Sequence, residues 1–307
     1  MTKMTILTKI RELNLSAAST TGRPLHLAAA SGLVCINSLI YVIADDELHL
    51  GVFRAADCEP GHLIQLFDGA LPEAKRERKK KKPDLEALTL LPAFGDYPHG
   101  ALLALGSGSR SNRRMGALLA LDTQGTVCVS PRVVDLSPIL APLDSEFPAL
   151  NIEGAIVSGD EMLLFQRGNK RQSENAIIGF QLSDFLDALN SQETRKIMPS
   201  TITKVDLGQI DGIPLCFTDA TPLPDCSIVF TAVAENTDDN YHDGPCAGAA
   251  VGIVDKNGSH TVHQLDRPHK IEGVHGAVDG DLIRLLLVTD HDNAEIPSEL
   301  FSATLRR

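Results

Sequence analysis

The sequence contains no tryptophan, and aromatic residues make up only 4% of its 307 positions. Proteins that bind single-stranded nucleic acids stack the bases on aromatic side chains, so such a surface is not expected here. Positive charge is also scarce, because 28 Lys and Arg residues face 40 Asp and Glu residues and leave a formal net charge of -12. This charge repels a phosphate backbone and suits cations or neutral ligands. We therefore expect no nucleic-acid partner.

Several short motifs are absent as well. The six cysteines form no C-x-x-C pair, which excludes a zinc ribbon and a dithiol redox motif. No run of about 18 apolar residues is present, and the first residues lack the apolar stretch of a secretory signal. We expect buried free thiols, no membrane partner and a cytoplasmic location.

The aliphatic part of the sequence is organised as a repeat. Each copy has a short strand with an acidic residue, a turn, an aliphatic strand, a polar cluster and a further apolar strand. Four copies place Glu86, Glu153, Asp219 and Glu272 at equivalent positions, and a weaker fifth copy that begins at Ser31 lacks the acid. The copies start near 32, 86, 153, 219 and 272, at intervals of 54, 67, 66 and 53 residues. These intervals are typical of propeller blades with their loops.

Short strands between turns, without a sustained helical period, predict an all-β fold. Closing the repeats into a ring protects their strand edges, so we predict one β-propeller domain over residues 1–307. Five blades are expected, and six blades or a two-sheet sandwich remain as alternatives. Residues 8–15 are predicted to supply the outer strand of the last blade, and residues 183–195 to form a helix on the rim.

One segment departs from the acidic composition. Residues 75–82 read KRERKKKK and are followed by Pro83. A charge run of this kind is usually a solvated, mobile loop, which is the structure we expect here. The alternative is a local patch that binds an anion or a partner.

The repeated acids indicate a site on the propeller axis. The first strand of each blade lines the central channel, so Glu86, Glu153, Asp219 and Glu272 should converge. Carboxylates that share one space raise one another's pKa unless a cation lies between them. Hard oxygen ligands suit calcium and, less often, magnesium. The alternative is that each acid only hydrogen-bonds the backbone of the adjacent blade.

The two Ile-Glu-Gly segments at 152–154 and 271–273, with their counterparts in the other repeats, resemble a known group of propellers. The group contains the calcium-activated apyrases and the "esterase-like activity of phytase" proteins, and the chain is most similar to an uncharacterised bacterial branch of it. The resemblance extends from about residue 30 to the end. It implies that each blade contributes one Ser or Glu to a central calcium site. Carried over, the ligands are Ser31, Glu86, Glu153, Thr218 or Asp219, and Glu272.

Polar clusters follow the second strand of the repeats and should surround one mouth of the channel. The third cluster also includes Asp238, Asp239 and His242. The predicted substrate-binding residues are Arg110, Arg113, Arg167, Asn169, Glu235, Asp290 and His291. With Lys170, the arginines would form an anion-binding half opposite an acidic half, because arginine binds carboxylate and phosphate bidentately. Taken singly, each cluster also fits an ordinary tight turn.

No catalytic residue is assigned, because the chain has no Walker loop, no G-x-S-x-G elbow and no H-E-x-x-H motif. Two functions remain. The first is a calcium-dependent hydrolase of phosphate or carboxylate esters, a reaction class that the resemblance implies. The second is a non-catalytic binding module with a structural axial metal, which recognises a small anionic ligand or a protein partner. The sequence assigns no oligomeric state.

Overall fold

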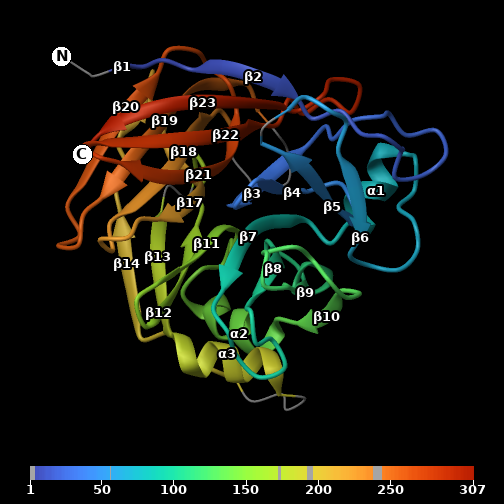
Figure 1. The fold of residues 1–307 in the computed structure, drawn as a ribbon. Helices are drawn as coiled ribbons and strands as arrows, with labels where there is room; N and C mark the ends of the chain where they lie inside the picture. The colour runs from blue at the N-terminus through green and yellow to red at the C-terminus, as the bar shows by residue number, and fades with distance from the viewer. Residues whose placement is uncertain (1–3, 56, 172–173, 192–195, 238–243) are drawn as a thin grey trace.

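The computed structural model describes residues 4–55, 57–171, 174–191, 196–237 and 244–307, and its strands form five blades (Figure 1). Blade 1 contains β3 (Ala30–Ile36), β4 (Leu39–Ala44), β5 (His49–Arg54) and β6 (His62–Gln65). Blade 2 contains β7 (Leu85–Leu91), β8 (Ala101–Gly106), β9 (Met115–Ala120) and β10 (Arg132–Asp135). Blade 3 contains β11 (Ile152–Ser158), β12 (Glu161–Gln166), β13 (Asn175–Gln181) and β14 (Thr201–Val205). Blade 4 contains β17 (Cys216–Pro222), β18 (Ile228–Glu235), β19 (Cys246–Val254) and β20 (His260–Leu265). Blade 5 contains β21 (Ile271–Asp279), β22 (Leu282–Thr289) and β23 (Glu299–Arg306), with a strand from the N-terminal segment.

The first strands of the blades form the inner wall of the ring. Each of β3, β7, β11, β17 and β21 contacts the next, and β21 returns to β3 (Figure 1). The predicted all-β propeller is therefore confirmed, with five blades rather than six.

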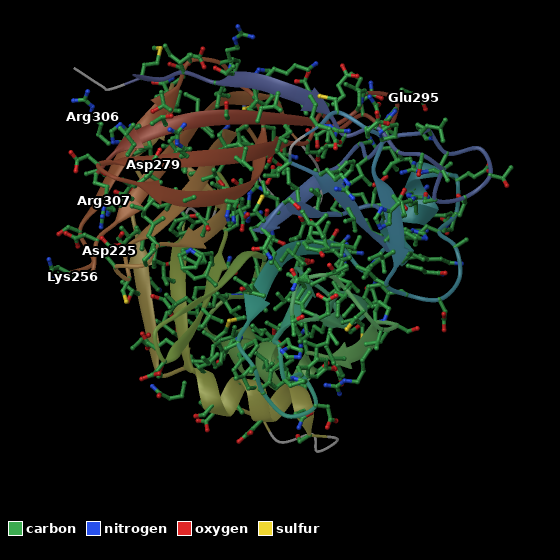
Figure 2. The ribbon with its side chains drawn as sticks, in the orientation of Figure 1. Asp225, Lys256, Asp279, Glu295, Arg306 and Arg307 are labelled. Carbon is green, nitrogen blue, oxygen red and sulfur yellow. The ribbon has the colours of Figure 1, made fainter. Side chains whose placement is uncertain are left out.

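The two ends of the chain meet in the last two blades. Strand β2 (Thr8–Glu12) pairs antiparallel with β23 and is the outermost strand of blade 5. Strand β1 (Met4–Thr5) pairs parallel with β20 of blade 4. At the other terminus, Arg307 forms an ion pair with Asp225 in the turn between β17 and β18, and Figure 2 shows both at the same edge of the molecule. These contacts fix both chain ends on blades 4 and 5.

The described helices lie outside the blades. Helix α3 (Leu182–Asn190) follows β13, and its buried Phe185, Leu186 and Leu189 pack on blade 3. Residues 192–195 of the predicted helical range lie outside the described residues. The remaining short elements are α2 (Ser137–Leu140), the 3₁₀ turns η1 (Ser111–Arg113) and η2 (Ala141–Ser145), and the hairpin of β15 (Gln209–Ile210) and β16 (Ile213–Pro214). None of the described helices is long and apolar enough to cross a membrane.

The basic run is not the solvated loop that the sequence predicted. Residues Lys75–Lys81 form helix α1, and Arg78 and Lys82 are buried. The Arg78 guanidinium donates to the carbonyl oxygen of Asp46, at 2.9 Å from Nε and 2.6 Å from Nη2. Long-range contacts to blade 1 therefore fix a segment whose composition alone suggested a mobile one.

The core lies between neighbouring blades and is mainly aliphatic. Among the few aromatic residues, Phe217 of β17 packs edge-on against Phe165 of β12 and Phe230 of β18, with ring centroids 5.2 Å apart in each pair. These contacts join blade 3 to blade 4 and hold the inner ends of the blades at fixed positions.

Candidate functional site

A β-bulge interrupts each inner strand near its start. The bulged residues are Ser31, Glu86, Glu153, Thr218 and Glu272. A bulge leaves one residue outside the ladder and changes the direction of its side chain. Four of these positions are the ones that the repeat predicted, and in blade 4 the bulge is at Thr218 instead of Asp219; we call the five residues the bulge ring.

The position in blade 4 is Thr218, and Asp219 lies beside the bulge ring. The Asp219 carboxylate accepts hydrogen bonds from the backbone N–H of Val274, at 2.8 Å, and of Ala220, at 2.7 Å. The Thr218 hydroxyl donates to the carbonyl oxygen of Ile271 in blade 5, at 2.7 Å. Asp219 therefore joins adjacent blades through the backbone, which is the alternative role that the sequence left open for the acids.

The residue after the bulge is glycine in three blades. A Cβ on Gly273 would lie 2.6 Å from Val288 Cγ2 and 3.1 Å from Gly32 Cα, and a Cβ on Gly154 would lie 3.2 Å from the backbone nitrogen of Ala220. Neighbouring inner strands approach so closely here that a side chain does not fit. The glycine of the Ile-Glu-Gly segments therefore has a packing role.

A cavity of about 520 Å³ opens where the inner strands begin. Four members of the bulge ring line it, together with two further sets of equivalent residues. One set lies two positions before each bulge and consists of Ala29, Asp84, Asn151, Cys216 and Lys270. The other consists of Asp45, Arg167 and Asp290, which directly follow the second strand of their blades, and of Val233, which lies within β18.

The second and third sets are linked by the same backbone contact in four blades. The N–H groups of Asp45, Ser107, Arg167 and Asp290 donate to the carbonyl oxygens of Ala29, Asp84, Asn151 and Lys270, respectively. The blade geometry therefore places Asp45, Arg167 and Asp290 at one mouth of the channel.

One side of the cavity is organised by Arg167. Its Nη1 lies 3.1 Å from Glu153 Oε2 and 3.6 Å from Glu272 Oε2, and its Nη2 lies 2.5 Å from Glu235 Oε2. Asn151 also donates to Glu153. Burial lowers the pKa of the guanidinium, but the three carboxylates outweigh it and raise that pKa well above its ordinary value. Arg167 is therefore a permanent positive charge among three buried acids.

Lys270 neutralises the adjoining part of the mouth. Its ammonium lies 2.8 Å from Asp292 Oδ1, 3.6 Å from Asp290 Oδ2 and 3.6 Å from Glu272 Oε1. Burial raises the pKa of Asp290 to about 8, although the charge of Lys270 lowers it. Within the described residues, Glu272 Oε1 is a buried oxygen without a hydrogen-bond partner.

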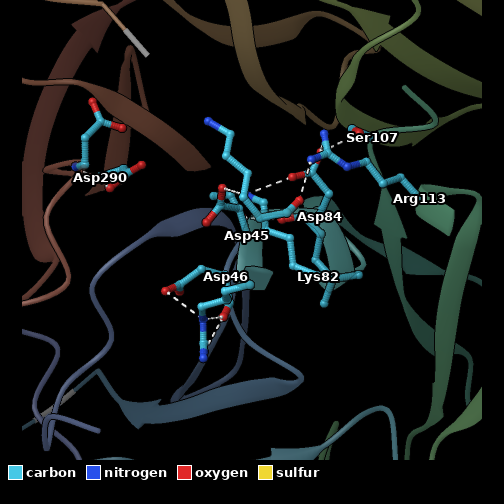
Figure 3. Close-up of polar contacts among 12 residues, drawn as sticks. Asp45, Asp46, Lys82, Asp84, Ser107, Arg113 and Asp290 are labelled. Atoms are coloured by element: carbon cyan, nitrogen blue, oxygen red, sulfur yellow. Dashed lines mark hydrogen bonds and ion pairs between the residues drawn. The ribbon is translucent and has the colours of Figure 1, made fainter. Parts of the chain in front are cut away.

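A second charged cluster of the cavity surrounds Asp84 (Figure 3). Lys82 contacts Asp45 and lies 2.9 Å from Asp84 Oδ1. Arg113 Nη1 and Ser107 Oγ each lie 2.6 Å from Asp84 Oδ2. Burial alone would raise the pKa of Asp84, but Lys82, Arg113 and Ser107 lower it below its usual value. Asp84 is therefore held as a carboxylate.

Glu86 differs from the other acids of the cavity. Its carboxylate forms no hydrogen bond or ion pair with any residue in the described ranges. Burial raises the pKa of Glu86 well above its ordinary value, and the charges of Glu153, Asp84 and Asp45 raise it further. The charge of Lys82 lowers this pKa, but among the described residues no cation forms an ion pair with Glu86.

The donor set fits a hard divalent cation at this point. One carboxylate oxygen from each of Asp45, Asp84 and Glu86 lies within 4.8 Å of the other two. Calcium accepts six to eight such oxygen ligands, and water and a substrate could complete the set. The Glu153 and Glu272 side of the bulge ring is already paired with Arg167. Of the bulge ring, Glu86 is thus the acid best placed to bind a metal.

The predicted substrate-binding residues divide into two groups. Arg113, Arg167, Asn169, Glu235 and Asp290 line the cavity, whereas Arg110 and His291 do not. Arg113 and Arg167 bind carboxylates of the protein itself. His291 Nε2 lies 3.5 Å from Glu299 Oε2, and Lys170 contacts Asn236 at the surface. Asp238, Asp239 and His242 lie outside the described residues.

Sequence reasoning named Lys82 only as part of the basic run, and it missed Asp45, Asp84, Asn151 and Lys270. The repeat contained the signal, because three of these residues stand two positions before a bulge residue. Asp45 directly follows β4, as Arg167 follows β12. Reading every column of the repeat, rather than the acidic column alone, would have found them.

The chain belongs to a family of unknown function, DUF6929. The family model matches residues 26–305. No curated protein matches the sequence. The resemblance to the calcium-activated apyrases and esterase-like phytase proteins is not confirmed by these matches.

Solved structures share the architecture. The α-L-arabinofuranosidase PaAbf62A from Podospora anserina is 12% identical over 99% of this chain and 98% of that one, with a TM-score of 0.53. A luciferin-regenerating enzyme is 10% identical over 97% and 95%, with a TM-score of 0.50. The GH43 endo-arabinanase from Bacillus licheniformis is 11% identical over 95% and 96%, with a TM-score of 0.42. At these identities the similarity concerns the fold alone.

Proposed function

We propose that the cavity is the active site of a calcium-dependent hydrolase of small phosphate or carboxylate esters. The observation that carries this proposal is the cluster of Asp45, Asp84 and Glu86, in which three ligand oxygens lie within 4.8 Å of one another and Glu86 forms no hydrogen bond or ion pair with a described residue. A cation held there faces an open cavity of about 520 Å³, large enough for a small organic substrate.

In this proposal, the residues of the cavity have three roles: they bind the cation, position a carboxylate and neutralise the remaining acids. Asp45, Asp84 and Glu86 hold the cation, and the bound calcium would supply polarisation of a substrate oxygen or a water molecule. Arg113 and Ser107 fix the position of the Asp84 carboxylate and keep it ionised. Arg167 and Lys270 neutralise the acids on the far side, so that an anionic substrate meets less repulsion there.

The test combines a melt with a turnover assay. Protein stripped of metal with a chelator is melted with and without calcium, and then incubated with a nucleotide, a phosphomonoester and an aryl ester. We expect calcium to raise the melting temperature and to be required for turnover, and Glu86→Gln to lose both effects. The matched control is Glu174→Gln, which changes a surface carboxylate that is 58% exposed. The proposal would be overturned if calcium did not change the melting temperature of the native chain.

A non-catalytic binding module is the second candidate. The observation in its favour is that Arg113 and Arg167, the arginines expected to meet an anion, are already paired with buried carboxylates. In that case calcium stabilises the folded ring by binding to it alone. A calcium-dependent rise in melting temperature without turnover of any of the three substrates would favour this candidate.

A further inference from the structure

Lys82 occupies the proposed cation site with its own positive charge. Its ammonium contacts Asp45 and lies 2.9 Å from Asp84 Oδ1, so it uses two of the three carboxylates of the cluster (Figure 3). The Lys82 side chain is only 7% exposed. Two cations that share the same oxygens at such distances repel each other strongly. A divalent cation can therefore enter only when the ammonium leaves.

The surroundings allow this movement without a change in the backbone. Lys82 ends helix α1, and Arg78 fastens that helix to the Asp46 carbonyl independently of the Lys82 side chain. The ammonium stands on a flexible four-carbon stem, and Lys82 itself lines the cavity. A change of rotamer can therefore carry the charge from the carboxylates into the open space.

A released ammonium would differ from the other cations of the cavity. Arg113 remains bound to Asp84, Arg167 to Glu153 and Glu235, and Lys270 to Asp292. Only Lys82 would lose its carboxylate partners to the incoming cation. With all three acids ionised, the cluster with Lys82 carries two negative charges, and addition of a divalent cation makes it neutral. An anion would then meet a free ammonium instead of a repulsive cluster.

We propose that Lys82 exchanges roles when the cation binds: it leaves Asp45 and Asp84 and binds the anionic group of the ligand. The proposal rests on the proposed cation site and makes binding ordered, cation first and anion second. Lys82 is then a substrate-binding residue supplied by the basic run 75–82.

Calorimetry with two probes, calcium chloride and glycerol 2-phosphate, tests the exchange. For the native chain we expect glycerol 2-phosphate to bind at least ten-fold more tightly with calcium than without it. In Lys82→Met, calcium should bind at least ten-fold more tightly than in the native chain, and its effect on glycerol 2-phosphate should disappear. Lys81→Met, which removes the same charge from an exposed position of α1, should behave like the native chain in both titrations.

A labelling experiment on the native chain covers the case in which Lys82→Met fails to fold. An amine-acylating reagent is applied, and the extent of labelling at Lys82 is read by mass spectrometry. We expect calcium to increase this labelling several-fold and glycerol 2-phosphate to reverse the increase. Unchanged labelling in the presence of bound calcium would overturn the exchange.

The outcomes separate the two proposals. If the native chain binds no calcium, the proposed cation site fails. If it binds calcium and hydrolyses an ester while Lys82→Met binds calcium no more tightly, the exchange alone fails.

Discussion

Replacing Arg167 by methionine should destabilise the folded protein, because it removes the counter-ion of three buried carboxylates. The guanidinium contacts Glu153, Glu235 and Glu272, whose exposed fractions are only 4%, 8% and 4%. Methionine has a similar length and keeps the apolar stem but removes the charge. Three buried carboxylates then lose their shared cation, and among the described residues only Glu272 keeps a second one, Lys270 at 3.6 Å.

The size of the effect follows from the burial of the partners. Breaking a buried ion pair by removing one partner costs about 3–5 kcal/mol, because an uncompensated charge stays inside. For a domain of this size, roughly 2 °C of melting temperature corresponds to 1 kcal/mol, so a fall of about 6–10 °C is expected at pH 8. Loss of the cation also raises the pKa of Glu153 and Glu272 further, and these two groups then take up protons in the folded state. Because the folded variant binds more protons than the unfolded chain, the deficit should shrink as the pH falls from 8 to 5.

Thermal and urea unfolding at pH 8 and pH 5 measure both effects. The matched control is Arg284→Met, which breaks an exposed pair with Asp279 and should cost no more than about 1 kcal/mol. The double variant Arg167→Met with Glu235→Gln should recover part of the loss. A loss below about 1 kcal/mol at pH 8, or an equal loss at both pH values, would refute the account of Arg167 as the central counter-ion.

Three further outcomes are expected. Gly273→Ala should cost about 1–3 kcal/mol in urea unfolding, because its Cβ would lie 2.6 Å from Val288 Cγ2, and full stability would contradict the close approach of the inner strands. Burial lowers the pKa of His275 to about 4, so the free energy of unfolding of the native chain should decrease by up to roughly 3 kcal/mol as the pH falls from 6.5 to 4. In a pH series of melts, His275→Gln should show a smaller decrease. Deleting residues 1–13 removes β2, which has four partner pairs with β23, and should lower the free energy of unfolding by about 4 kcal/mol or more. The deletion should also expose blade 5 to proteolysis. An unchanged melting temperature would contradict ring closure by that strand.

The fold could be predicted because each sequence repeat corresponds to one blade. Ser31, Glu86, Glu153 and Glu272 stand at one column of the sequence, and the structure places a β-bulge at each of them. The sequence could not decide between Thr218 and Asp219 in blade 4. That decision depends on which residue leaves the ladder, and the register of β17 against β18 identifies Thr218.

Helix α1 shows why the basic run was misread. Lysine and arginine favour helices, but their number suggested only a solvated segment. The partners that order the segment, the Asp46 carbonyl for Arg78 and the Asp45 and Asp84 carboxylates for Lys82, belong to other elements. The net charge of a segment cannot reveal that two of its cations are neutralised from outside.

The partners of the arginines likewise cannot be found from the sequence around them. Arg113 and Arg167 were predicted to receive an anionic ligand, yet in the structure they are counter-ions of buried acids. Counter-ions of this kind reduce the number of acids that are free to bind a metal. Of the three glutamates in the bulge ring, Glu153 and Glu272 contact Arg167, and Glu86 alone has no hydrogen bond or ion pair with a described residue. The proposed cation site therefore lies where no arginine pairs with the bulge-ring glutamate, beside Lys82, whose flexible stem allows its ammonium to move aside.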